Sequence, residues 1–492
     1  MAKKTEILNA LTETLGEKAV ISEGDSLASR LTDWRGDYHG SALALLRPAD
    51  TNEVSAVLRL ASKYRLAIVP QGGNTSLCGA ATPDTSGQTL ILSLERMNRI
   101  REIDPEANFM TVEAGCILQK LHEEAARHDR LFPLNLGARG SCSIGGNLST
   151  NAGGLNVLAY GNTRDLTMGL EVVLADGKVL PLLSSLRKDN TGYDLKNLFI
   201  GAEGTLGVIT AATLKLFPAP KICVTGFAGI RDINAGITLL NRLQTASGGK
   251  VTAFELMPKT IIDNVLLHYP EMTRPLENLP RFSILMDVSS ASQADAAPGP
   301  DGSTPLNALL EEVLAEAYED GLVSDATVAS SSTQQQALWA IREATPEAEV
   351  KAGRAYKADI SIPLRHMQDF YDRAYAEAEK LCPGLRCLGF GHLGDGNLHY
   401  NLGEPPEGRE DFAKLYPAFD AILIRLLGKL GGSVSAEHGI GQKKLAMMEQ
   451  IKDPVTLSVM AAIKTRLDPM NIMNPGKVLP PPALKKSLKE QG

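Results

Sequence analysis

Two histidines seven residues apart flank a short run of turn residues in the stretch "GHLGDGNLH", residues 391–399. The chain has only eight histidines in 492 residues, so this pair is a natural place to look for chemistry. Imidazole nitrogens bind divalent metals and exchange protons near neutral pH. The stretch therefore indicates a metal site, a catalytic acid–base group, or a polar hairpin with hydrogen-bonded structural histidines.

The Asp395-Gly396 pair inside this stretch is typical of a two-residue hairpin turn. Such a turn would pair His392 directly with His399 on one face of the hairpin. Opposed Cβ atoms in a hairpin lie about 4.5–5.5 Å apart, a separation that lets two imidazoles share one metal ion. Asn401 would point to the same face, because side chains alternate along a strand.

A carboxylate and a third histidine follow in "SAEHGIGQKK", at Glu437 and His438. Two histidines and one glutamate form a ligand set for Zn²⁺, with Mn²⁺ or Fe²⁺ as alternatives, that leaves coordination positions open for a substrate. His392, His399 and Glu437 are therefore candidate metal ligands, with hydrogen-bonded structural histidines as the alternative. A neutral imidazole at His438, beside the metal, would suit a general base.

Cations that could hold an acidic substrate occur in "LWAIREATPEAEVKAGRAYKADISIPL" at Arg342, Arg354 and Lys357. Arginine binds carboxylates through two parallel hydrogen bonds. Solvated surface charge is the alternative for all three residues. Lys357 is predicted to begin an alternating strand over residues 357–364, which would let it point inward.

Glycine-rich segments indicate a second kind of site. "PQGGNTSLCG", residues 70–79, is predicted to turn at glycines with positive φ and to offer backbone N–H groups to a phosphate, although an ordinary surface loop is the alternative. Nine glycines lie between Gly137 and Gly177. So many flexible residues favour an extended cofactor that lies along the backbone. The spacing GxGxxG is missing from residues 70–79, which argues against a nicotinamide-type first turn.

Hydrophobic periodicity predicts the elements that would position these residues. A helix is expected from Thr51, capped by Asp50 or Thr51 and followed by a strand that ends at Pro70. Another helix should begin near Ile117, and a hairpin should turn at Asp176-Gly177. We expect an N-terminal helical segment at residues 1–45, a cofactor-binding domain at 46–218, a substrate domain at 219–450 and a C-terminal segment at 451–492.

Composition limits the class of protein. The formal net charge of −7 argues against a nucleic-acid binder, which would usually be basic. The chain contains no run of 18 apolar residues, so no membrane span is expected. Its six cysteines form no CxxC pair. They are expected to be reduced thiols, and the chain is therefore predicted to be cytoplasmic.

Several motifs together resemble a known family. "PQGGNTS", "SIGGNLSTNAGG", "YGNTRD" and "GAEGTLGVIT" resemble the FAD-binding domain of the vanillyl-alcohol oxidase family. "GHLGDGNLHYN", "EHGIGQKK" and "LDPMNIMNPGKVLP" resemble the C-terminal part of its D-2-hydroxyacid dehydrogenase branch. The resemblance runs from Trp34 to Pro480. It implies an α+β fold with a two-subdomain FAD-binding domain, an α/β substrate domain with an antiparallel sheet, and a C-terminal helical segment.

The resemblance also implies which residues bind the cofactor. FAD is expected to be non-covalent, because "PQGGNTS" has no histidine for covalent attachment. The implied FAD-binding residues are Pro70, Gln71, Gly72, Gly73, Asn74, Thr75, Ser76, Gly137, Ser141, Gly145, Asn147, Thr150, Asn151, Gly153, Gly154, Gly204, Ile209 and Asn474.

For activity, the branch implies metal-assisted oxidation of a D-2-hydroxyacid to the 2-oxoacid, with hydride transfer to flavin N5. His438 would take the hydroxyl proton, and Arg342, Lys357, Asn401 and His438 would bind the substrate. D-2-hydroxyglutarate is the first expected substrate, and D-lactate and glycolate, the latter as an oxidase FAD subunit, are alternatives. Enzymes of the branch that act on 2-hydroxyglutarate have a threonine four residues after the arginine, where this chain has Pro346.

The branch implies partners as well. Electrons are expected to pass to a separate acceptor, such as an electron-transfer flavoprotein, a quinone or a cytochrome, and the chain is expected to form a homodimer. Two alternatives to this activity stay open. One is a non-catalytic flavin-binding subunit of a complex, and the other is an oxidase that uses oxygen.

Overall fold

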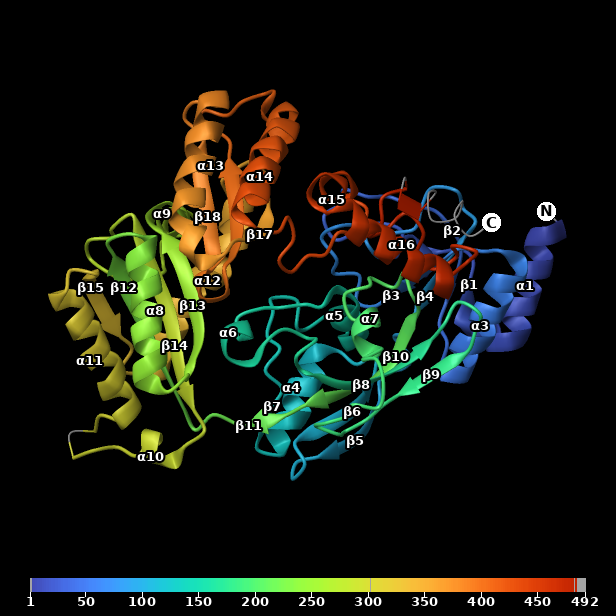
Figure 1. Cartoon of the computed structure of the whole chain (residues 1–492), viewed down its shortest axis with the longest axis horizontal. Coiled ribbons are helices and arrows are strands. Elements are labelled where there is room, and N and C mark those ends of the chain that lie inside the picture. The colour runs from blue at the N-terminus through green and yellow to red at the C-terminus, as the bar shows by residue number, and fades with distance from the viewer. Residues whose placement is uncertain (1, 301, 482, 485–492) are drawn as a thin grey trace. The chain divides into compact units, whose positions relative to one another are not determined.

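The structure, a computed structural model, describes residues 2–300, 302–481, 483 and 484. The chain folds into two compact units (Figure 1). The first unit contains residues 1–153, 162–217 and 437–492, and the second contains residues 154–161 and 218–436. The chain thus leaves the first unit briefly at residues 154–161 and again after residue 217, and it returns at Glu437.

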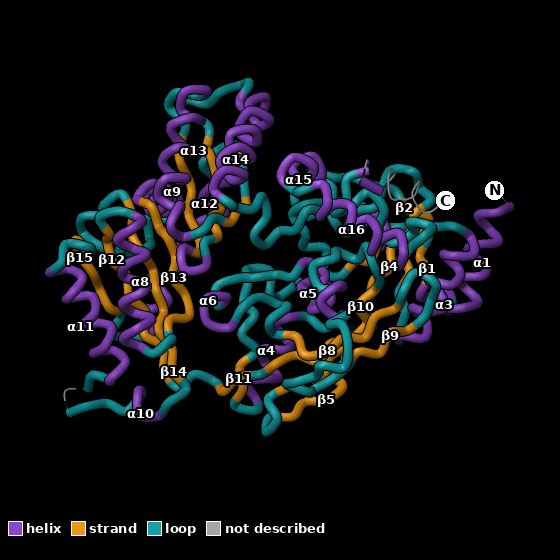
Figure 2. Tube along the Cα trace, in the orientation of Figure 1, coloured by secondary structure: helices purple, strands orange, loops and turns teal. Residues whose placement is uncertain are grey.

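The first unit contains a four-stranded and a five-stranded sheet (Figure 2), and its strand β7 (Arg130–Leu131) pairs with β11 (Phe217–Pro218) in a separate two-stranded sheet. In the four-stranded sheet, ordered β1-β2-β4-β3, the strands β2, β4 and β3 run parallel, and β1 is antiparallel to β2. The five-stranded sheet, ordered β5-β6-β10-β8-β9, is antiparallel throughout. The strands of this unit are β1 (Val20–Ile21), β2 (Ala42–Leu46), β3 (Ile68–Gln71), β4 (Thr89–Ser93), β5 (Ile100–Asp104), β6 (Phe109–Glu113), β7 (Arg130–Leu131), β8 (Thr167–Val173), β9 (Val179–Leu182) and β10 (Val208–Lys215).

The helix predicted from Thr51 shows why these elements form. It is α3, and its N-cap Asp50 accepts a hydrogen bond from the Glu53 N–H. Val54, Val57, Leu58 and Ala61 recur at helical spacing and are fully buried. The helices of this unit are α1 (Ala2–Leu15), η1 (Glu17–Ala19), α2 (Asp25–Ala28), α3 (Thr51–Tyr64), α4 (Leu118–Arg127), α5 (Ile144–Thr150), α7 (Lys196–Phe199), α15 (Leu445–Ile451) and α16 (Pro454–Leu467). The helix near Ile117 and the hairpin at Asp176-Gly177 are also confirmed.

The second unit is built on one eight-stranded sheet, ordered β15-β12-β14-β13-β18-β19-β16, with β17 also paired to β19. Its strand pairs are all antiparallel, as expected for the substrate domain. The strands are β12 (Ile222–Ile230), β13 (Val251–Pro258), β14 (Phe282–Ser290), β15 (Val323–Val328), β16 (Ala355–Tyr356), β17 (Asp359–Ser361), β18 (Arg386–His392) and β19 (Asn397–Gly403), and the chain enters the unit through β11 (Phe217–Pro218).

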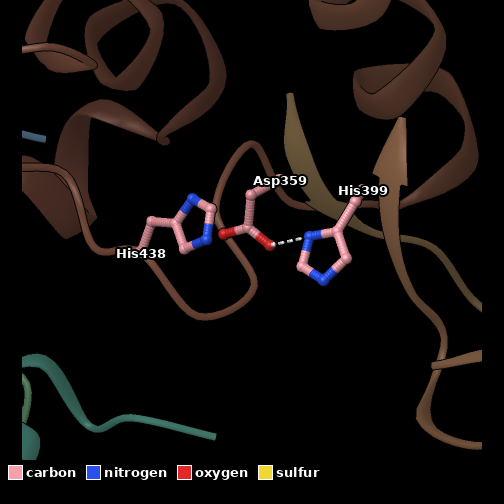
Figure 3. A group of neighbouring side chains, drawn as sticks. All are labelled: Asp359, His399 and His438. Carbon is pink, nitrogen blue, oxygen red and sulfur yellow. Dashed lines mark ion pairs between the residues drawn. The ribbon is translucent and has the colours of Figure 1, made fainter. Parts of the chain in front are cut away.

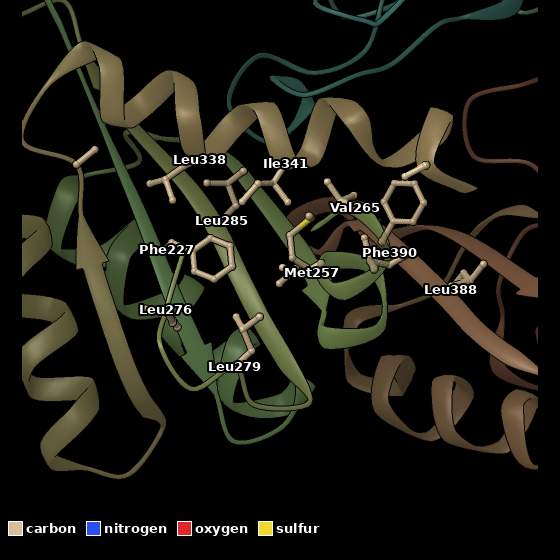
Figure 4. Close-up of a cluster of buried hydrophobic side chains, with 14 residues drawn as sticks. Phe227, Met257, Val265, Leu276, Leu279, Leu285, Leu338, Ile341, Leu388 and Phe390 are labelled. Atoms are coloured by element: carbon tan, nitrogen blue, oxygen red, sulfur yellow. The ribbon is translucent and has the colours of Figure 1, made fainter. Parts of the chain in front are cut away.

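Helices cover this sheet. One face packs against α9 and α12 through a hydrophobic cluster in which Phe227, Met257 and Leu285 of the strands meet Val265 and Ile341 of the helices (Figure 4). The helices of this unit are α6 (Val157–Tyr160), α8 (Ile233–Ser247), α9 (Lys259–His268), α10 (Gln293–Ala296), α11 (Pro305–Glu319), α12 (Ser332–Lys351), η2 (Leu364–His366), α13 (Met367–Leu381), η3 (Leu393–Asp395), η4 (Phe412–Leu415) and α14 (Tyr416–Leu430). Among the residues that the structure describes, no helix is both long and apolar enough to cross a bilayer.

Candidate functional site

The two histidines of the opening stretch lie on neighbouring strands of the second unit, His392 at the end of β18 and His399 in β19. Their ring centroids are 5.6 Å apart with the rings nearly perpendicular. A nitrogen of one ring lies within 4.8 Å of a nitrogen of the other. The structure therefore brings the two imidazoles close enough for one cation to bind both.

The register of this hairpin differs from the prediction. His399 pairs with Phe390, not with His392, because the connection is longer than the two residues Asp395 and Gly396. Residues 393–395 form the 3-10 turn η3, and Gly396 adopts a φ of 82°. His392 is two residues from Phe390 and so faces the same side, which makes it a diagonal neighbour of His399. The shared face was predicted correctly, and the direct opposition was wrong.

Each of the two imidazoles has a buried carboxylate at its Nδ1 atom. Glu255 Oε1 lies 2.6 Å from His392 Nδ1, and Asp359 Oδ1 lies 3.9 Å from His399 Nδ1. Figure 3 shows the Asp359 carboxylate directed at the His399 ring. Metal-binding histidines usually have their second nitrogen oriented by a carboxylate, as His392 has through Glu255. This leaves Nε2 of His392 as its candidate ligand atom, whereas 3.9 Å is too long for a hydrogen bond and does not select a nitrogen of His399.

Arg342, predicted to bind the substrate carboxylate, lies on α12 and donates from Nε to Glu255 Oε2 at 2.7 Å. Its guanidinium lies over the Phe390 ring, with 4.8 Å between the guanidinium carbon and the ring centroid. One buried carboxylate thus contacts both Arg342 and His392. Burial alone would raise the pKa of the Glu255 carboxyl, but His392 and Arg342 outweigh burial and hold this pKa well below its ordinary value.

Lys357 and Asn401 are brought together by another buried carboxylate, that of Glu349 on α12. Lys357 Nζ lies 3.2 Å from Glu349 Oε2. The Asn401 amide donates to both oxygens of Glu349, at 2.9 and 3.0 Å. Lys357 lies between β16 and β17, and the strand begins at Asp359, so the prediction that Lys357 begins a strand is wrong. Arg354 instead pairs with Glu404 and is half exposed.

Sequence reasoning missed three acidic residues of this site, Glu255, Glu349 and Asp359. All three are buried, and each contacts a residue that had been predicted. A signal was present for Glu255, since it lies in the apolar strand segment "VTAFELMP". Charged residues are almost never fully buried unless they are paired. The other two lay in segments of ordinary polarity and offered no comparable signal.

Glu437 and His438 belong to the first unit and directly follow Ala436, the last residue of the second. The Ala436 N–H donates to Asp359 Oδ2 at 3.2 Å, so the end of the second unit is attached to β17. After His438, the backbone N–H groups of Ile440 and Gly441 donate to the Glu203 carboxylate at 2.7 and 2.8 Å. The two predicted residues are thus held between two anchored stretches of backbone.

In the first unit, the predicted cofactor loop follows β3. Gly72 and Gly73 do not have the positive φ that was predicted, whereas Gly79 does, at 66°. These two glycines are required by close approach, because a Cβ atom at Gly73 would lie 2.0 Å from the Ser141 carbonyl oxygen. A Cβ atom at Gly72 would lie 2.2 Å from Ser143 Oγ. The two glycine-rich segments therefore lie against each other.

The side chains of this loop hold its own backbone. Gln71 donates to the carbonyls of Arg30 and Ala81, and Asn74 donates to the Thr32 carbonyl. Two backbone N–H groups, at Cys78 and Ala80, donate to Ser76 Oγ. Arg30 also donates from Nη1 to the Gly72 carbonyl at 3.3 Å, so the loop is held at both its side chains and its backbone.

The second predicted segment forms α5, whose N-cap Ser143 accepts from the Gly146 N–H. Gly145 and Asn147 lie inside this helix, and Thr150 ends it by donating to the Gly146 carbonyl. Asn151 takes the left-handed C-cap position with a φ of 49°. Of the remaining predicted residues, Gly137, Ser141 and Gly153 flank the helix in the same unit, while Gly154 begins the short stretch that belongs to the second unit.

Two predicted residues have buried oxygens that fit a ligand. Asn147 Oδ1 and Asn474 Oδ1 are buried, and neither has a hydrogen-bond partner among the described residues. Asn474 donates from Nδ2 to the carbonyls of Ala80 and Glu203, at 2.9 and 2.7 Å, so its Oδ1 atom is held in a fixed place. A buried acceptor without a donor is costly, and an N–H or O–H of a bound molecule would satisfy it.

Glu203 connects the segments of the first unit and was not predicted. Its N–H donates to the Ser149 carbonyl of α5, and its carboxylate accepts from Ile440 and Gly441. The next residue, Gly204, has a φ of 72° and lies against Pro70. Ile209 is buried in β10. Burial raises the pKa of the Glu203 carboxyl despite these N–H donors.

Comparison with known proteins matches this architecture to flavoproteins. Residues 42–182 match the family described as FAD binding domain, and residues 219–478 match FAD linked oxidases, C-terminal domain. Among solved structures, p-cresol methylhydroxylase is similar with a TM-score of 0.73 at 16% identity, covering 97% of each chain. Alkyldihydroxyacetonephosphate synthase has a TM-score of 0.70 at 17% identity, with 96% of this chain and 86% of that chain covered. Both likenesses concern the fold, which is of the predicted vanillyl-alcohol oxidase type.

Closer relatives exist in sequence. A mitochondrial D-2-hydroxyglutarate dehydrogenase of Arabidopsis thaliana is 38% identical, with 95% of this chain and 80% of the relative covered. That of Danio rerio is 39% identical, with 94% and 83% covered. A D-2-hydroxyglutarate dehydrogenase of Xanthomonas citri is 34% identical, with 91% of each chain covered.

The names of the relatives contradict the predicted cytoplasmic location. Those from Arabidopsis thaliana, Danio rerio and Bos taurus are named mitochondrial. The prediction depended on unpaired cysteines, and the structure does contain six free thiols. Free thiols exclude only an oxidising compartment and cannot distinguish one reducing compartment from another. The cytoplasmic location was therefore the wrong conclusion from that observation.

Proposed function

The chain belongs to the FAD-linked oxidase family, and from this premise we propose that it is an FAD-dependent dehydrogenase that oxidises D-2-hydroxyglutarate to the 2-oxoacid. The observation that carries the proposal is the composition of the site in the second unit. Two histidines that could hold a cation lie on the sheet of this unit. The same unit contains two cations, Arg342 of α12 and Lys357 of the connection between β16 and β17, each held by a buried carboxylate. A dicarboxylate with an α-hydroxyl group is the substrate that such a set suits.

FAD fits the residues of the first unit. Residues 72–73 lie directly against residues 141–143, which places two glycine-rich segments side by side, and such backbone suits a pyrophosphate. The unsatisfied oxygens of Asn147 and Asn474 suit the N–H and hydroxyl groups of a flavin. The full proposed set is the one implied by the family resemblance. Binding without a covalent bond is supported by the buried Cys142 thiol, whose pKa is raised by burial and which is therefore a weaker nucleophile.

A divalent cation, with Zn²⁺ as first choice, fits the residues of the second unit. A nitrogen of the His392 ring lies within 4.8 Å of a nitrogen of the His399 ring, and the buried carboxylates of Glu255 and Asp359 lie beside these two rings. A divalent cation bound by His392 and His399 would add positive charge to the site that Arg342 and Lys357 are proposed to form for an acid. We propose Glu437 as the third ligand, since it follows Ala436, which is anchored to Asp359.

When bound, FAD supplies a two-electron acceptor and the cation lowers the pKa of an alcohol that it coordinates. The protein's part is to bind and orient the acid and to remove one proton. Arg342 and Lys357 would hold carboxylate oxygens, with Asn401 beside Lys357 assisting their orientation. His438 would accept the hydroxyl proton at a ring nitrogen, since it follows the proposed ligand Glu437 directly. Both electrons and the second hydrogen leave C2 as hydride.

The reduced cofactor requires an acceptor, and we propose a separate carrier such as an electron-transfer flavoprotein, a quinone or a cytochrome. We also propose a homodimer. Peroxide formation in air, compared with turnover on an artificial dye, separates a carrier-dependent dehydrogenase from an oxidase. Light scattering of the purified protein gives its oligomeric state.

The function is tested by mixing the anaerobic, flavin-loaded protein with one acid at a time and recording the yellow flavin absorbance. D-2-hydroxyglutarate should bleach it faster than D-lactate, D-malate and glycolate. Bleaching by D-lactate alone would replace the proposed substrate. A spectrum that no acid changes would favour a flavin-binding subunit without catalysis. Repeating the series after chelation tests the need for the cation.

A further inference from the structure

The two oxygens of the Glu255 carboxylate contact two different residues, the proposed metal ligand His392 and the proposed substrate-binding residue Arg342. Oε1 lies 2.6 Å from His392 Nδ1, and Oε2 accepts from Arg342 Nε at 2.7 Å. The Glu255 side chain is completely buried, and its β13 position pairs with His392 of β18 in the sheet register. We propose that Glu255 is a positioning residue, an inference that rests on the proposed function. Its carboxylate would fix which nitrogen of His392 binds the metal and, at the same time, the orientation in which the Arg342 guanidinium meets the substrate.

The contact with His392 decides which nitrogen can bind a cation. A carboxylate is an acceptor only, so the Nδ1 atom must carry the proton that Glu255 accepts. The Nε2 atom then keeps its lone pair for the metal. Without the carboxylate, both tautomers and other ring rotations become accessible, and part of the protein would present the wrong nitrogen.

The contact with Arg342 decides which way the guanidinium points. Glu255 occupies Nε, and the ring of Phe390 lies against the guanidinium face. The two terminal amino groups are left as the edge for a carboxylate, the geometry in which arginine binds an acid with two hydrogen bonds. The centroid of the same Phe390 ring lies 5.2 Å from that of the His399 ring. Phe390 therefore packs against both a proposed metal ligand and the proposed substrate-binding arginine.

A buried carboxylate with a purely structural role would not need a histidine and an arginine as its partners. Asp287, on the adjacent strand β14, is also a largely buried carboxylate on the α12-covered face. It accepts hydrogen bonds from neutral donors, Thr225 Oγ1 at 2.6 Å and Trp339 Nε1 at 3.0 Å. Asp287 therefore provides a matched control, because its amide variant replaces a carboxyl group on the same face without touching His392 or Arg342.

The experiment compares Glu255→Gln with Asp287→Asn in the full chain. A glutamine has one acceptor oxygen and can serve His392 or Arg342, not both. We expect Glu255→Gln to weaken Zn²⁺ binding by about 10–100-fold, the range for loss of a partner behind a metal ligand. Zn²⁺ affinity is measured by competition with a chromogenic chelator. The KM for the acid should rise by about tenfold or more, while Asp287→Asn leaves both quantities within about twofold of wild type.

The outcomes separate the two proposals. Wild-type Zn²⁺ affinity and KM in a folded Glu255→Gln protein would overturn the positioning role. Equal losses in Asp287→Asn would also overturn it, because they would show that any change from carboxyl to amide on this face has the same effect. If Glu255→Gln does not fold, Glu255→Asp carries the test. It keeps the charge but withdraws the carboxylate by about 1.5 Å, so unchanged Zn²⁺ affinity in that variant would again overturn the proposal. Failure of every acid to bleach the wild-type flavin would refute the function, while the Zn²⁺ titration would still decide the role of Glu255.

Discussion

The Asn401 amide donates to both oxygens of the buried Glu349 carboxylate, at 2.9 and 3.0 Å. Lys357 Nζ lies 3.2 Å from Oε2 of the same carboxylate. One helix residue thus orients two of the proposed substrate-binding groups, which lie on β19 and on the connection between β16 and β17. Loss of Glu349 should therefore act on substrate binding even though Glu349 itself is not proposed to contact the acid.

Glu349→Gln tests this relationship. The amide keeps the shape of the side chain but loses the charge that holds Lys357, and its NH₂ group would oppose the Asn401 amide. We expect the KM for the acid to rise about tenfold, equivalent to about 1.4 kcal/mol, with a smaller change in kcat. Steady-state kinetics with a dye acceptor measures both. Glu343→Gln, on an exposed position of α12, is the control and should behave as wild type; equal effects in both variants would contradict the prediction.

Gly73→Ala tests the cofactor cradle. The added Cβ atom would meet the Ser141 carbonyl at 2.0 Å, so the two glycine-rich segments must separate. Such overpacking costs about 1–3 kcal/mol and should displace the backbone that faces FAD. We expect a folded protein that loses most of its flavin during purification. Gly140→Ala adds a methyl group where no atom lies within 4 Å, so it should keep its flavin. Full flavin content in Gly73→Ala would argue against this placement.

The fold was largely predictable because its signals are local. Residues 51–64 combine an N-cap at Asp50 with apolar positions at helical spacing, and both features appear in α3. The hairpin of β18 and β19 was predicted for the same reason, since an Asp-Gly pair has few alternatives. Its register was not predictable, because η3 and the φ of Gly396 depend on the carbonyl of Ile362, which a Cβ atom at residue 396 would meet at 2.5 Å.

The carboxylates of the site show what a single sequence conceals. Glu255 is 137 residues from His392 along the chain, and only the pairing of β13 with β18 brings them together. Glu349 is 52 residues from Asn401, and the path of α12 across the sheet creates that contact. Residue types and spacing identify a histidine pair within one hairpin. They do not identify partners that depend on strand order.

Removal of the cation should abolish reduction of the flavin by the acid and leave the flavin bound. Without it, no ion in the proposed site would coordinate the α-hydroxyl group of the acid and lower its pKa. We expect activity to return on adding Zn²⁺, with Mn²⁺ compared in parallel. His399→Asn should weaken Zn²⁺ binding by more than the roughly 10–100-fold expected for an outer partner. His366→Asn, outside this site, is the control. Full activity with less than one metal per chain would refute the metal role.

His438→Ala tests the proposed base. Proton transfer by a positioned imidazole contributes about 10²–10⁴-fold, so flavin reduction in stopped flow should slow by that factor while Zn²⁺ binding changes little. Added imidazole should restore part of the rate, since it can replace the missing ring. A variant that reduces its flavin at the wild-type rate would remove His438 from the mechanism.

Asp287→Asn should change how stability depends on pH. Burial raises the pKa of the Asp287 carboxyl, so the folded protein holds a proton that the unfolded chain has lost over the pH range between the two pKa values. The stability that this proton contributes is complete below the unfolded pKa of about 3.9 and is lost as pH rises through the folded pKa.

An asparagine stays neutral and can still accept from Thr225 and Trp339. The variant should therefore gain stability over wild type as pH rises, by on the order of 1.4 kcal/mol for each pKa unit of the shift. Melting temperatures of both proteins across pH 3–8, a range that begins below the unfolded pKa of about 3.9, measure the difference. A melting-temperature difference that is constant or shrinks over this whole range with rising pH would contradict the raised pKa.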